Sequence, residues 1–203
     1  MPTILSSEIP YFIGYHGYIS LPIFVLCVLF INFINNESSR NISKIVVFSC
    51  FIFFNQSING LLKQICRQPR PKNPINICYN DSKTNSEMGM PSGHAQGVMH
   101  ALTFLLLTQQ DIYISAIGIV VAGLTLLQRY VYRKHTPMQI LVGSILGIII
   151  GFGGYYVSKI VKIETTSSPV ILFLSFLMVI ISFYVDHNNI IERHFISLLK
   201  RDD

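Results

Sequence analysis

Apolar runs close to 20 residues long recur along the whole chain and constrain its fold more than any other feature. Such runs lie at about 18–34, 44–62, 93–109, 112–128, 137–157 and 169–185. A helix needs roughly 20 apolar residues to cross a hydrocarbon core of about 30 Å. The sequence therefore predicts an all-α fold, a polytopic membrane helix bundle with about six transmembrane helices.

Composition places these runs in a single integral-membrane domain that covers residues 1–203. Hydrophobic residues make up 51% of the chain and charged residues 12%, whereas a soluble domain carries about 25% charged residues. Because the apolar runs are spread over the whole length, we expect no separate water-soluble domain. The first ten residues lack the basic region and the cleavage site of a signal peptide, so the first span should be retained.

Charge and cysteine content narrow the range of partners. The net charge is +5, but the basic residues do not form the dense tract of a nucleic-acid-binding arm, so a phosphate-bearing lipid is the better partner. The four cysteines form neither a CxxC motif nor another spacing typical of metal ligands. We therefore expect no metal, no cofactor, no nucleic acid and no obligate protein partner, and we expect contact with the bilayer and a phosphorylated lipid.

The first of three polar clusters is the basic segment Lys63–Pro71, KQICRQPRP, which follows the second apolar run. Basic residues at the mouth of a transmembrane helix commonly anchor it at the membrane surface. In the alternative interpretation the segment is a phosphate clamp. Lys63 then contributes a point charge, and Arg70 contributes a planar guanidinium that donates two hydrogen bonds to phosphoryl oxygens.

The second cluster, residues 91–94 with the sequence PSGH, lies at the start of the third run. Ser92 is typical of a helix N-cap, and Gly93 allows an anion to approach the free N–H groups and the positive dipole end of the helix. A lone histidine is commonly structural, but the place of His94 in this turn makes it a candidate catalytic residue. His100 has no such neighbours and is predicted to be a core residue.

The third cluster consists of Arg129, His135 and Gln139. In one interpretation residues 136–139, TPMQ, form a capping box with proline at the first helical position, and Gln139 only satisfies the start of the fifth span. In the other, the Gln139 side-chain carbonyl accepts a hydrogen bond from Nδ1–H of His135, so that Nε2 is presented as a nucleophile. Arg129 would complete the phosphate clamp.

Together the clusters read Lys-x6-Arg-Pro, Pro-Ser-Gly-His and Arg-x5-His, in that order. This combination resembles the phosphatidic acid phosphatase type 2 superfamily of lipid phosphatases, directly over residues 63–139. The resemblance implies metal-independent hydrolysis of a phosphoester or phosphoanhydride through a phosphohistidine. It implies that His135 attacks phosphorus and that His94 protonates the leaving oxygen. The phosphoryl oxygens would be bound by Lys63, Arg70, Ser92, Gly93 and Arg129.

Two positions depart from the pattern of that superfamily: Gln128 replaces a serine and Gln139 replaces an aspartate. An amide can orient a histidine ring but cannot neutralise its charge. Residues 90–96, MPSGHAQ, and 135–139, HTPMQ, are similar to the motifs of dolichyl diphosphatases, although glycine at position 93 replaces a second serine. This branch implies that dolichyl diphosphate loses its terminal phosphate, which recycles the lipid carrier for protein N-glycosylation in the endoplasmic reticulum.

Two questions stay open at the level of sequence. The first is the activity. The alternatives are a broader lipid phosphatase acting on phosphatidate or undecaprenyl diphosphate, and a non-catalytic membrane binding protein. Membrane sidedness is the second question: eleven Lys and Arg residues lie on the face with the three clusters and four on the other, which favours a cytoplasmic active site. Basic residues kept for phosphate binding would bias that count. The resemblance implies a lumenal active site, and we follow the resemblance.

Overall fold

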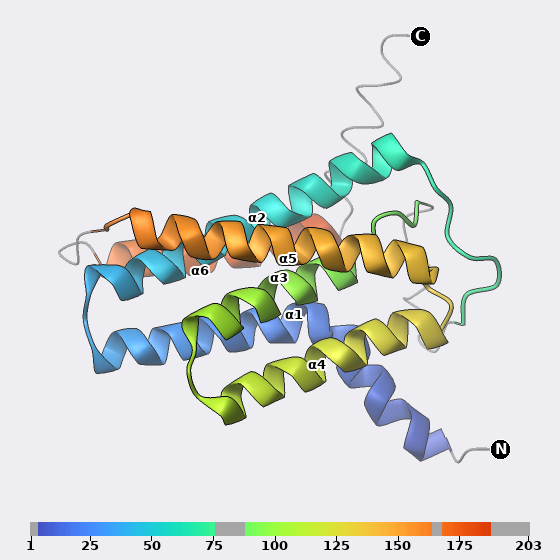
Figure 1. Cartoon of the computed structure of the whole chain (residues 1–203), viewed down its shortest axis with the longest axis horizontal. Helices are drawn as coiled ribbons and strands as arrows, with labels where there is room; N and C mark the ends of the chain where they lie inside the picture. Colours follow the sequence, from blue (N-terminus) through green and yellow to red (C-terminus); the bar gives the residue numbers. More distant parts are fainter. Residues whose placement is uncertain (1–3, 76–87, 164–167, 188–203) are drawn as a thin grey trace, which may run out of the picture.

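Six α-helices lie lengthwise in one bundle (Figure 1). The computed structural model describes residues 4–75, 88–163 and 168–187. The helices are α1 (Ile4–Asn35), α2 (Ser39–Cys66), α3 (Gly93–Thr108), α4 (Ile112–Val131), α5 (Pro137–Ile160) and α6 (Ser168–His187). The predicted all-α fold class is confirmed, and each apolar run coincides with one helix, although the first helix begins well before residue 18.

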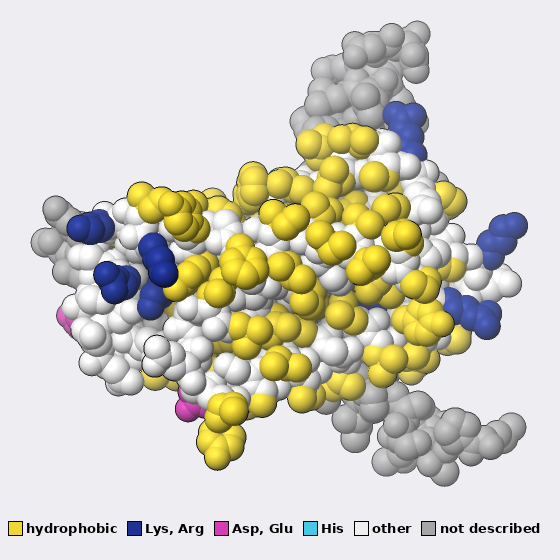
Figure 2. All heavy atoms as spheres, in the orientation of Figure 1, with side chains coloured by type: hydrophobic (Ala, Val, Ile, Leu, Met, Phe, Trp, Pro, Cys, Tyr) yellow, Lys and Arg dark blue, Asp and Glu magenta, His cyan; other side chains and the backbone are white. Residues whose placement is uncertain are grey.

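Four of the six helices are long and apolar enough to cross a membrane by length and composition, namely α1 from Gly14 onward, α2, α4 and α5. Helix α3 has 16 residues, and the apolar part of α6 is Pro169–Val185, so both fall short of roughly 20 residues. Hydrophobic side chains cover the middle of the face shown in Figure 2, and Lys and Arg gather toward its ends. These features indicate a multi-pass membrane protein.

Helix α3 lies close against α5 because α5 carries small residues where the two helices meet. A Cβ atom on Gly143 would lie 2.5 Å from the carbonyl oxygen of Ser92, and one on Gly147 would collide with the carbonyl oxygen of Gln96. Small residues at such positions let two transmembrane backbones approach each other. The backbone N–H of Ser92 also donates to the carbonyl oxygen of Gln139 at 3.1 Å, so the start of α3 is fixed to the start of α5.

The helix order brings the three polar clusters to one end of the bundle. The C-terminal ends of α2 and α4 and the N-terminal ends of α3 and α5 meet there (Figure 1). Just beyond α2, Pro69 pairs with Met88 in an isolated β-bridge. This pairing holds the segment after α2 beside the segment that leads into α3.

Candidate active site

His135 lies in the short connection between α4 and α5 and is buried, with 2% of its surface exposed. Its Nδ1 atom is 2.9 Å from the carbonyl oxygen of Gly89, an atom that can only accept a hydrogen bond. Nδ1 therefore carries the ring proton, and Nε2 keeps its lone pair. The Nη1 atom of Arg70 is 3.3 Å from this Nε2, so a cation able to bind phosphate lies at the nitrogen that would attack phosphorus.

The surroundings keep the His135 ring neutral. Burial lowers its pKa well below the usual value of 6.5, and the positive charges of Arg70, Arg129 and Lys63 lower the pKa further. The hydrogen bond to the Gly89 carbonyl raises the pKa, but its effect is smaller than that of burial or of any of the three charges. Neutral imidazole is the form that can act as a nucleophile. The first and third clusters thus act on the same ring.

Gln139 does not hold the His135 ring. Its Oε1 atom accepts from the backbone N–H of Thr136 at 3.1 Å, and its own backbone N–H donates to Oγ1 of Thr136 at 3.3 Å. These two bonds are the predicted capping box. The predicted hydrogen bond between His135 and Gln139 is therefore wrong, because the helix cap uses the side-chain oxygen of Gln139 and the backbone carbonyl of Gly89 accepts from His135 instead.

Gln139 nevertheless supports the two groups that contact His135. Its Nε2 atom donates to the carbonyl oxygen of Pro69 at 2.9 Å, next to Arg70 in the chain. A Cβ atom on Gly89 would lie 2.6 Å from the same Nε2, so the amide packs directly against that glycine. Any influence of Gln139 on the His135 ring passes through these neighbouring segments.

Two of the proposed phosphate-binding cations are buried. Arg129 is 1% exposed and Lys63 is 9% exposed, whereas a residue that only anchors a helix keeps its charged group in water. Nε of Arg129 donates to Oε1 of Gln128 at 2.7 Å, and its guanidinium lies 5.4 Å from the ring centre of Tyr15. Because a residue that only anchors a helix keeps its charge in water, the burial of these two cations favours the phosphate clamp over the membrane anchor.

Ser92 is the N-cap of α3, as the sequence predicts, with Oγ accepting from the backbone N–H of Ala95 at 3.5 Å. The first backbone bond of the helix runs from N–H of Gln96 to the carbonyl oxygen of Ser92. The N–H groups of Gly93 and His94 precede it and lie at the helix end that attracts anions. The backbone N–H of Ser92 is bonded to α5, so the hydroxyl is the group with which Ser92 can donate to a phosphate.

A network of buried amides supports this turn. Nδ2 of Asn59 donates to Oε1 of Gln96 at 2.8 Å and to the carbonyl oxygen of Pro91 at 3.4 Å. Nε2 of Gln96 donates to Oδ1 of Asn55 at 3.0 Å. A satisfied buried network of this kind rigidifies the backbone around it. A Cβ atom on Gly93 would lie 3.1 Å from Oδ1 of Asn59, which leaves little room for a larger residue.

His94 is half-buried at the first turn of α3, with its ring centre 3.9 Å from that of Tyr18. Its Nε2 atom has no hydrogen-bond partner within the part of the chain that the structure describes. Such a nitrogen can exchange a proton with a bound ligand. His100 is 1% exposed and stacks on Phe48 at 5.2 Å between ring centres, so its prediction as a core residue is confirmed.

Sequence reasoning missed several residues that shape this site. The role of Gly89 rests on a backbone carbonyl, which leaves no signal in the side-chain pattern. Tyr18 lies in an apolar run, and no motif links it to His94, whose ring it contacts. The amides of Asn55, Asn59 and Gln96 did carry a usable signal, because polar residues inside an apolar span rarely face lipid.

Comparison with known proteins identifies the family. The sequence profile of the PAP2 superfamily matches residues 44–163, more than half of the chain. The chain belongs to the PAP2 superfamily. An undecaprenyl-diphosphatase from Sulfolobus acidocaldarius is 28% identical to it over 135 residues, which cover 66% of this chain and 61% of that relative. The match thus spans about three fifths of the length of the curated relative. No solved structure matches the chain.

The PAP2 superfamily is the family that the three clusters resemble, and a phosphatase activity toward phosphorylated lipids is, for this chain, part of the proposal below. The matched segment contains all three clusters. The lipid is not resolved by these matches, and the curated relative is named an undecaprenyl-diphosphatase. The dolichyl branch, the endoplasmic reticulum and N-glycosylation therefore belong to the proposal below.

Proposed function

We propose that this PAP2 protein removes the terminal phosphate from a polyisoprenyl diphosphate through a phosphohistidine on His135. The observation that carries the proposal is the pair of contacts on the His135 ring. Gly89 fixes the proton on Nδ1, and Arg70 stands at Nε2, where the phosphoryl group must lie. A neutral nucleophile and a phosphate-binding cation thus share one position.

The proposed reaction has two steps. Nε2 of His135 forms a bond to the terminal phosphorus, the bond from phosphorus to the bridging oxygen breaks, and His94 protonates that oxygen so that the lipid monophosphate leaves. His94 then takes a proton from water, whose oxygen attacks the phosphohistidine and releases inorganic phosphate. The phosphoryl oxygens are bound by the three cations and the start of α3, through Lys63, Arg70, Arg129, the Ser92 hydroxyl and the N–H groups of Gly93 and His94.

Two observations support a polyisoprenyl diphosphate as the substrate. The motifs at residues 90–96 and 135–139 are similar to those of dolichyl diphosphatases, and the curated relative is described as an undecaprenyl-diphosphatase. Dolichyl diphosphate is our first candidate, with the enzyme in the endoplasmic reticulum and the active site in its lumen. Glycan mapping of the 63–92 segment tests the sidedness.

Phosphate release by the detergent-purified protein tests the proposed function. The panel contains dolichyl diphosphate, undecaprenyl diphosphate, farnesyl diphosphate and phosphatidate at equal concentrations. We expect the three diphosphates to be hydrolysed faster than phosphatidate. Preference for phosphatidate would replace the proposal with a broader lipid phosphatase, and no release from any lipid would favour a non-catalytic binding protein.

A further inference from the structure

An apolar groove of about 450 Å³ lies between α1, α2 and α6. Ile23 and Phe30 line it on α1, Ile45 on α2, and Phe176 and Ile180 on α6. Helix α6 packs mainly against α2 rather than α1, so α1 and α6 flank α2 without closing over it. The volume lies within the range of about 300–1,000 Å³ that is typical of ligand pockets.

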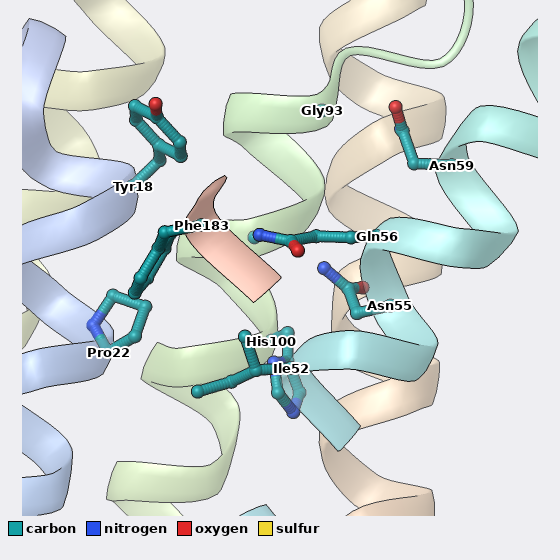
Figure 3. Close-up of a pocket in the computed structure, with 10 residues that line it drawn as sticks. Tyr18, Pro22, Ile52, Asn55, Gln56, Asn59, Gly93, His100 and Phe183 are labelled. Atoms are coloured by element: carbon teal, nitrogen blue, oxygen red, sulfur yellow. The ribbon is translucent and has the colours of Figure 1, made fainter. Parts of the chain in front are cut away.

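Phe183 lies between the groove and the candidate active site. This side chain lines both the groove and a small cavity beside Gly93. Figure 3 shows Phe183 beside Pro22 and Tyr18 on one side of that cavity, with amide side chains of α2 across from them. The ring centres of Tyr18 and Phe183 are 6.3 Å apart, and the Tyr18 ring lies against the His94 ring. Two aromatic rings thus connect the catalytic turn to the groove.

The groove runs from the active-site end toward the other end of the bundle. Tyr18 and Phe30 are twelve residues apart on α1, which corresponds to about 18 Å along a helix axis. A lipid whose phosphate lies at His94 and His135 must extend its chain in this same direction to enter the hydrocarbon core. The groove lies along this direction.

We propose that this groove binds the first isoprene units of the substrate and that Tyr18 and Phe183 direct the chain into it from the active site. The inference rests on the proposed function and names the part of the substrate that α1, α2 and α6 recognise. Bilayer lipid is as apolar as the groove, so recognition comes from shape and contact rather than from transfer out of water. A single groove fits one chain, as in a polyisoprenyl lipid, better than the two chains of phosphatidate.

Filling the groove tests this inference. Ile180 in the groove is 51% exposed, and Ile119 on α4, outside the groove, is 53% exposed, so Ile180→Trp and Ile119→Trp are a matched pair. Cys27 also lines the groove, and Cys27→Trp fills it from the opposite wall. The first measurement is kcat/KM for farnesyl diphosphate, which depends on binding of the isoprenoid chain. The second is the inhibition constant of inorganic phosphate, which depends only on the head-group site.

We expect Ile180→Trp and Cys27→Trp each to lower kcat/KM for farnesyl diphosphate at least tenfold and to leave the inhibition constant of phosphate within twofold. Ile119→Trp should change neither quantity by more than twofold. An unchanged kcat/KM in both groove variants would overturn the inference while leaving the proposed function intact. A parallel loss of phosphate inhibition would also overturn it, because the damage would then lie in the head-group site. Inactivity of the unmodified protein toward every diphosphate in the panel would overturn the proposed function, and the groove inference with it.

Discussion

The carbonyl oxygen of Gly89 lies 2.9 Å from Nδ1 of His135 and fixes the tautomer of that ring. Aspartate is the residue that the superfamily pattern places at position 139, and glutamine stands there in this chain. A backbone carbonyl orients the imidazole as an aspartate would, but it carries no full negative charge with which to stabilise an imidazolium. The site thus orients the proposed nucleophile, His135, without supplying a negative charge to its ring.

Gln139→Ala should lower the activity strongly and the stability only slightly. The variant loses the bond to the Pro69 carbonyl and the packing against Gly89, so we expect kcat to fall at least tenfold. Loss of the capping box should lower the free energy of unfolding by about 1 kcal/mol. The measurements are kcat with farnesyl diphosphate and denaturation monitored in detergent. A variant with full activity and lower stability would show that Gln139 is only a helix cap.

Gln139→Glu separates the two roles of this side chain. A glutamate keeps the length and the acceptor for the Thr136 N–H but cannot donate to the Pro69 carbonyl when ionised. We expect a folded and measurably active protein. A negative charge near His135 favours its protonated form, so the acid limb of the pH profile should move to higher pH. An unaltered profile would contradict this reasoning.

His135→Ala should abolish turnover and leave the fold intact. An acid-labile phosphoenzyme, trapped by rapid acid-free denaturation, should form in the unmodified protein and be absent from this variant. His100→Ala is the control, because that ring is buried against Phe48 in the middle of α3, and turnover per folded molecule should stay within about twofold. A phosphate label that persists without His135 and disappears without His94 would reverse the two roles.

The acid limb of the pH dependence of kcat/KM reports the His135 ring. The pKa of this ring is lowered well below 6.5, and protonation removes the proposed nucleophile, so the acid limb should lie well below pH 6.5. Arg70→Gln removes one charge that lowers this pKa, so the acid limb should move to higher pH. Arg67→Gln is the control, since Arg67 is exposed and is not among the charges that act on His135. An unmoved limb in the Arg70 variant would exclude His135 as the titrating group.

Phosphate release should persist in excess chelator. Lys63, Arg70 and Arg129 supply the positive charge that a divalent ion would otherwise bring to the phosphoryl oxygens. Within residues 4–75, 88–163 and 168–187, no group of three or more His, Cys, Asp or Glu residues could hold a metal ion. The assay compares activity in excess EDTA with activity in added magnesium. Activity lost with chelator and regained with magnesium would contradict the proposed mechanism.

The sequence by itself determined the helices and where the chemistry is concentrated. Apolar length alone predicts six helices because a hydrocarbon core sets a fixed span. Local rules also predicted the N-cap at Ser92 and the capping box at Thr136, since each involves residues at most three positions apart. The order of helices across the membrane was enough to gather the three clusters on one face.

Only the tertiary structure decided which groups contact the His135 ring. Gln139 is four residues away in the chain and was the natural candidate, but its side-chain oxygen is committed to Thr136. The acceptor is Gly89, which is 46 residues away and acts through its backbone. Side-chain patterns do not encode backbone carbonyls, and contacts between distant segments depend on how closely α3 packs against α5. The groove between α1, α2 and α6 likewise depends on helix packing. The side chains that line it are of the same apolar types as those that face lipid, so the sequence cannot tell the two surfaces apart.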